Sequence, residues 1–182
     1  HVLAEASSTK PYRQYLSEDY LVHCFATTKL LNGAKDMAKY YAMIDDPAFV
    51  SQLSERVELN FLPSNPTIWA PDDAVWCELA VKNVPELTIK VFEINALSYF
   101  LAKGRQVDTS IDLDGLIATD ETTHTFDEPP IRRVQRRFEL PQLSSAGTYI
   151  VEFIGGGKSS RALIRKGHLR HVERCGAAGH LF

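Results

Sequence analysis

The sequence predicts a mainly β protein, an antiparallel β-sandwich preceded by a short α-helical segment, and three observations support this fold class. Apolar and polar residues alternate in short runs through residues 81–167, which is the pattern of half-buried strands. Turn-forming residues separate these runs at intervals typical of a sandwich. Before residue 58, by contrast, apolar side chains recur at the wider spacings that place them on one face of a helix.

The N-terminal segment is predicted to contain about three short helices. Ser17 suits the N-cap of the first helix, and Gly33 is positioned to end it. The run 37–44 gathers its apolar residues on one face. Asp46 can cap the third helix, because the proline that follows it is tolerated at the first helical position.

The predicted strands would place alternate residues, such as Ile89, Val91, Tyr149 and Val151, between two facing sheets. Full burial of such a side chain contributes roughly 1.5–3 kcal/mol. The candidate strands are residues 75–82, 87–94, 106–112, 121–126, 133–140, 148–154, 159–166 and 168–173, with 56–62 as a further edge strand. The predicted domains are a helical segment at 1–57, a sandwich at 58–175 and a tail at 176–182.

The composition bears on the possible partners. With 20 basic and 23 acidic residues the net charge is -3, which provides no positive field for binding nucleic acid or an anionic membrane. No apolar run reaches the roughly 20 residues that span a bilayer. The three cysteines, Cys24, Cys77 and Cys175, are too few and too scattered for a disulfide framework, so the compartment stays open.

The motifs of common enzyme classes are missing. There is no G-x-S-x-G elbow and no cysteine in a recognisable catalytic setting, so we predict a protein that is not an enzyme and has no cofactor. The glycine-rich run 155–160 first suggests a phosphate-binding loop, but Glu152 stands where that loop requires a glycine and a strand-like run follows. A hairpin turn explains these glycines.

The loop at 110–121 is the basis of an alternative function, a calcium- or carbohydrate-binding sandwich. Asp112, Asp114 and Glu121 match ligand positions of a calcium-binding loop, and they are the candidate metal ligands. Ser110 stands at the first ligand position, and neither flank predicts the helices that hold an EF-hand loop. The competing interpretation is a strand that ends in a polar Asp-Gly turn.

Several runs resemble a known family. The run VKNVPELTIKVFEINALSYF at 81–100 is followed by SIDLDGLIA, DEPPIRRVQRRFELPQL and GTYIVEFIGGGKSSRALIRKG. In this order they resemble the first macroglobulin-like domain of the alpha-2-macroglobulin family, over about 59–172. The resemblance implies an immunoglobulin- or fibronectin-like sandwich that serves as one of a series of domains.

The same resemblance implies a function. Family members trap proteases, often with a thioester formed in a Cys-Gly-Glu-Gln motif. Cys175 is followed by Gly176 and then by alanine, so no thioester residue carries over. We therefore expect a non-catalytic structural or protein-interaction domain that contacts neighbouring domains of a large protein and proteases. An extracellular or periplasmic location is also implied.

Overall fold

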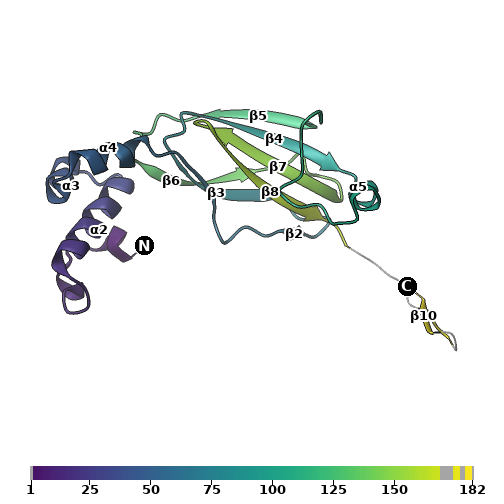
Figure 1. The fold of residues 1–182 in the computed structure, drawn as a ribbon, viewed down its shortest axis with the longest axis horizontal. Helices are drawn as coiled ribbons and strands as arrows, with labels where there is room; N and C mark the ends of the chain where they lie inside the picture. The colour runs from purple at the N-terminus through teal and green to yellow at the C-terminus, as the bar shows by residue number, and fades with distance from the viewer. Residues whose placement is uncertain (1, 169–173, 177–178, 182) are drawn as a thin grey trace.

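The computed structural model describes residues 2–168, 174–176 and 179–181 of the chain. A cluster of short helices lies at one end of the molecule, and a β-sandwich forms the larger part (Figure 1). The predicted fold class, a helical segment followed by a sandwich, is confirmed. None of the helices in these residues is both long and apolar enough to cross a bilayer.

The three predicted helices form at the expected positions. Asp46 accepts a hydrogen bond from the Phe49 amide at 3.0 Å, as its predicted capping role requires. Ser17 occupies the N-cap position of the first long helix, but its side chain makes no capping bond. A short helix and a 3₁₀ turn at the N-terminus were not predicted. The elements are α1 (Val2–Glu5), η1 (Lys10–Tyr12), α2 (Glu18–Leu31), α3 (Met37–Ile44) and α4 (Pro47–Glu55).

Two facing sheets form the sandwich. One has three strands in the order β1-β3-β6, and the other has five in the order β2-β8-β7-β4-β5. Neighbouring strands are antiparallel, apart from the two-residue strand β2, which pairs with β8 in parallel. The strands are β1 (Glu58–Phe61), β2 (Ile68–Trp69), β3 (Trp76–Lys82), β4 (Glu86–Ile94), β5 (Asp120–Thr125), β6 (Arg133–Glu139), β7 (Gly147–Gly155) and β8 (Lys158–Lys166), followed by a separate hairpin of β9 (Arg174–Gly176) and β10 (Gly179–Leu181).

The main core lies between the two sheets. The four residues predicted to be buried there, Ile89, Val91, Tyr149 and Val151, are all buried. Phe153 is fully buried, and its ring makes edge-to-face contacts with Phe61 and Phe138 at centroid distances of 5.4 and 5.6 Å. Alternation along the strands therefore identified the inward-facing side chains correctly.

The strand predicted at 106–112 is wrong. The chain forms the helix α5 (Ala96–Lys103) and then a loop that returns across the outer face of the five-stranded sheet. Val107 and Ile111 are buried because this loop packs on Phe92 and Ile150, not because it joins a sheet. The strand predicted at 168–173 falls, apart from its first residue, outside the described residues.

The hairpin turn predicted for the glycine-rich run is confirmed. Gly156 and Gly157 connect β7 to β8 with φ angles of +57° and +74°, a combination that favours glycine at both positions. A Cβ atom on Gly156 would lie 2.9 Å from Val57 and 3.1 Å from the Asn83 carbonyl oxygen. Gly156 therefore lets the end of the helical segment pack closely against this turn.

Cys77 gives the fold a measurable pH dependence. Its thiol is buried in the main core, and burial raises its pKa to about 12. The unfolded thiol loses its proton near its ordinary pKa, so stability is retained below pH 9 and decreases between pH 9 and 12. Because of this thiol, we expect the free energy of unfolding to be about 1.4 kcal/mol lower at pH 10 than at pH 8.

Urea titrations of the native chain and of Cys77→Val at both pH values isolate this contribution, because all other titrating groups cancel in the comparison. The Cys77→Val protein should lose less stability than the native chain. Equal losses in the two proteins would contradict the assigned pKa.

Candidate protein-interaction surfaces

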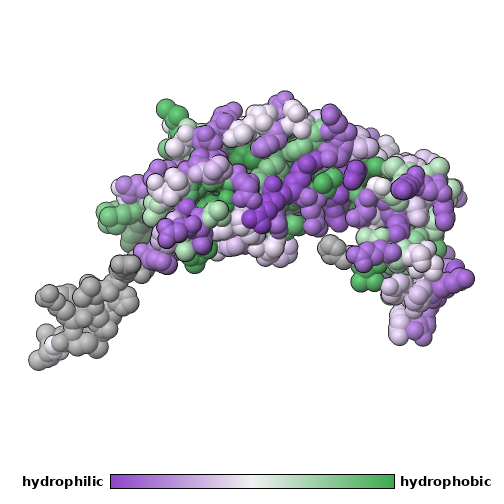
Figure 2. All heavy atoms as spheres, turned by 180° about the vertical axis from the view of Figure 1, so that it is seen from behind, coloured by the Kyte–Doolittle hydropathy of each residue, from purple (hydrophilic) through white to green (hydrophobic). Residues whose placement is uncertain are grey.

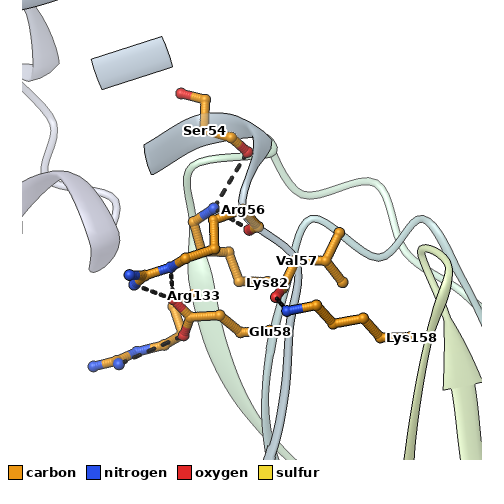
Figure 3. A network of polar contacts seen from close by, with 7 residues as sticks. All are labelled: Ser54, Arg56, Val57, Glu58, Lys82, Arg133 and Lys158. Atoms are coloured by element: carbon orange, nitrogen blue, oxygen red, sulfur yellow. Dashed lines mark hydrogen bonds and ion pairs between the residues drawn. The ribbon is translucent and has the colours of Figure 1, made fainter. Parts of the chain in front are cut away.

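The helical segment is fastened to the sandwich through Lys82, at the end of β3. Its side chain is 1% exposed, and its ammonium group donates hydrogen bonds to the carbonyl oxygens of Ser54 (3.2 Å) and Arg56 (2.7 Å) (Figure 3). Asn83 donates to the Glu55 carbonyl oxygen at 2.8 Å. Carbonyl groups at the end of α4 lack helical partners, and a cation there also interacts favourably with the helix dipole.

A carboxylate lies beside this lysine. Glu58 is only 7% exposed and accepts a hydrogen bond from Nε of Arg56 at 2.9 Å, while Arg133 lies 3.8 Å away on β6. Burial lowers the pKa of Lys82, the charge of Glu58 opposes that shift, and Arg56 adds to it. Lys158 donates to the Val57 carbonyl oxygen at 2.7 Å from the β7–β8 turn (Figure 3).

We call this set of contacts the joint. Ile131, from the sandwich, extends it by packing into the separate core of the helical segment beside Leu30 and Leu53. The two parts of the chain therefore share both polar and apolar contacts. The joint consists of Ser54, Glu55, Arg56 and Val57 on the helical side and of Glu58, Lys82, Asn83, Ile131, Arg133 and Lys158 on the sandwich side.

A second candidate surface lies on α5. Leu97, Phe100 and Leu101 share one face of this helix at i, i+3 and i+4, while Tyr99 packs inward. Hydrophobic side chains are visible on the end of the sandwich that carries α5 (Figure 2). We call the surface the apolar end. It consists of Leu97, Phe100, Leu101, Leu116 and Ile117, whose exposed fractions range from 47% to 92%.

A groove of about 630 Å³ lies beside the apolar end. Its floor includes Tyr99 and Ile111, and Leu116 connects it to the apolar end. The charged side chains that line it are of both signs. They are the acidic Glu93, Asp112 and Asp114 and the basic Lys103 and Arg105.

No element was predicted at 96–103, although the sequence contains a signal for α5 there. Asn95 caps the helix by accepting a hydrogen bond from the Ser98 amide at 2.9 Å, and Gly104 ends it with a φ angle of +66°. The Lys82 contacts had no such local signal.

The candidate calcium ligands do not form a common site. Asp112 accepts a hydrogen bond from the Asp114 amide at 3.0 Å, so it closes a local turn. Glu121 lies on β5, where Lys90 is its ion-pair partner at 3.3 Å. Among the described residues, no group of three acidic, histidine or cysteine side chains is arranged to hold a metal ion. The geometry therefore gives the calcium interpretation no support.

Two family models match this chain. Residues 1–57 match the Actin-binding protein F N-terminal domain. Residues 87–167 match the AbpF first immunoglobulin-like domain, and this region contains most of the five-stranded sheet. The sandwich is an immunoglobulin-like domain.

A curated relative matches both parts of the chain. Actin-binding protein F from Dictyostelium discoideum is 39% identical over 177 residues, which cover 96% of this chain. The chain spans 8% of the length of that relative. No solved structure matches the chain significantly.

These matches correct the macroglobulin resemblance, which is wrong. Runs such as GTYIVEF place alternate side chains, Tyr149, Val151 and Phe153, in the core between the two sheets, and unrelated sandwiches share that pattern. The expected role in a macroglobulin-like protein, with proteases as partners, is wrong for the same reason. The expected extracellular or periplasmic location depended on that resemblance and has no further support.

Proposed function

We propose that this chain is a non-catalytic actin-binding module, in which the helical segment and the immunoglobulin-like domain act together. The observation that carries this proposal is the similarity to one relative, Actin-binding protein F, across both parts of the chain in the same order. A match to the sandwich alone would have supported only a fold, because immunoglobulin-like domains serve many functions.

The joint supports the idea of a single module. An actin subunit presents a fixed surface, so two contacting parts bind best when their relative orientation is set in advance. Lys82 and Glu58 are buried sandwich residues, and each is hydrogen-bonded to Arg56 of the helical side. The helical segment is therefore held in one orientation by the sandwich, which lowers the entropy cost of binding with both parts.

Co-sedimentation with actin filaments tests the proposal. We expect the chain to pellet with filaments in a saturable manner, with a Kd on the order of 1–10 μM, typical of a weak single module in a larger protein. The amount pelleted without filaments is the baseline. Pelleting that never rises above that baseline at tens of micromolar filament subunits would refute the proposal.

A further inference from the structure

We propose that the apolar end is the docking surface for the next domain of the same polypeptide. This inference does not depend on actin binding. Strand register supports the location. Ile94, the last residue of β4, pairs with Thr148 at the start of β7, and Thr148 pairs with Arg165 near the end of β8. The helix α5 starts directly after β4, so it lies at the edge of the sandwich where β8 ends and the chain leaves (Figure 1).

The chemistry of the surface fits a protein partner. Interfaces combine an apolar centre with a polar rim, and large apolar patches on a soluble domain mark such interfaces. The three side chains on α5 provide apolar anchors, and the groove beside them provides charges of both signs. A partner with its own apolar patch and a few charged side chains would complete this arrangement.

The comparisons support the next domain of the polypeptide as the occupant. The sandwich matches a family model described as the first immunoglobulin-like domain, and the relative is far longer than this chain. The chain leaves the sandwich at the end of β8, beside α5, so a domain that follows in the same polypeptide is tethered near this surface and has a high effective concentration there.

A second copy of the chain fits the surface less well. A stable interface between separate molecules uses about 20–30 residues on each side. The apolar end has five exposed apolar side chains on one short helix and one loop. A surface of this size is sufficient for a tethered partner, because the tether removes most of the cost of association.

Hydrogen exchange tests the proposal. We would compare residues 1–182 with the natural polypeptide extended through the following domain. The α5 amides should exchange at least about tenfold more slowly in the longer protein, since docking suppresses local opening. In the longer protein, Leu101→Glu should restore the fast exchange. Tyr15→Glu, at an equally exposed position 75% accessible on the helical segment, should leave α5 protected.

Equal α5 exchange in the two proteins would overturn the proposal. So would a stable dimer of residues 1–182 in sedimentation that Leu101→Glu dissociates, because the occupant would then be a second copy. Actin co-sedimentation of residues 1–182 is independent of both results, so a failure of the docking proposal is distinguishable from a failure of the actin proposal.

Discussion

Replacing Lys82 with methionine should lower the free energy of unfolding by about 3 kcal/mol, because each hydrogen bond from a buried charged group contributes roughly 1.5–3 kcal/mol. Methionine keeps the packing of the lysine stem but has no donor. The carbonyl oxygens of Ser54 and Arg56 would then lose their partner, and Glu58 would lose a nearby positive charge. Urea denaturation measures the loss.

Lys90→Met is the matched control for this substitution. Lys90 also lies on a strand beside a carboxylate, Glu121, but the two side chains are 35% and 53% exposed, against 1% for Lys82. The control should lose no more than about 0.5 kcal/mol, as expected for a surface ion pair. Equal losses in the two variants would show that Lys82 does not fasten the joint.

Replacing Phe153 with alanine should lower the free energy of unfolding by about 3–5 kcal/mol, the range for truncating a buried phenylalanine. Its side chain is fully buried at the centre of the main core, and alanine would leave a cavity between the sheets. The ring contacts with Phe61 and Phe138 would also be lost. Thermal or urea unfolding measures the effect.

Phe100→Ala is the control for the core substitution. It removes the same side chain from the apolar end, where half of it is already accessible to solvent. The expected loss is below about 1 kcal/mol. A loss at Phe100 comparable to that at Phe153 would mean that the apolar end is part of the packed structure of the isolated chain.

The strands of the sandwich were predictable because each depends on a local pattern. Every second side chain of β4 (Leu87, Ile89, Val91) and of β7 (Tyr149, Val151, Phe153) faces the core between the sheets, and this spacing is legible without knowing which strands are neighbours. The alternation did mislead at 106–112, where Val107 and Ile111 belong to a loop that packs on the outer face of the five-stranded sheet, outside the two-sheet core. An apolar pattern reports burial, but it does not report which surface buries the residue.

The joint was not predictable from the sequence. A single lysine at the end of a strand is ordinarily exposed. Lys82 is buried because the end of α4 covers it, and its hydrogen-bond partner there, Ser54, lies 28 positions earlier in the chain, too far for a local pattern to reveal. The position of α4 over the end of β3 depends on the whole tertiary arrangement. The resemblance was misleading for a related reason, since it depended on strand patterns that many sandwiches share.

The central claim is that the helical segment and the immunoglobulin-like domain form one cooperative unit. Scanning calorimetry of the native chain tests it most directly. A single transition with equal calorimetric and van't Hoff enthalpies is the predicted result, and Lys82→Met should lower its midpoint. Two separate transitions in the native chain, one for each core, would contradict the claim.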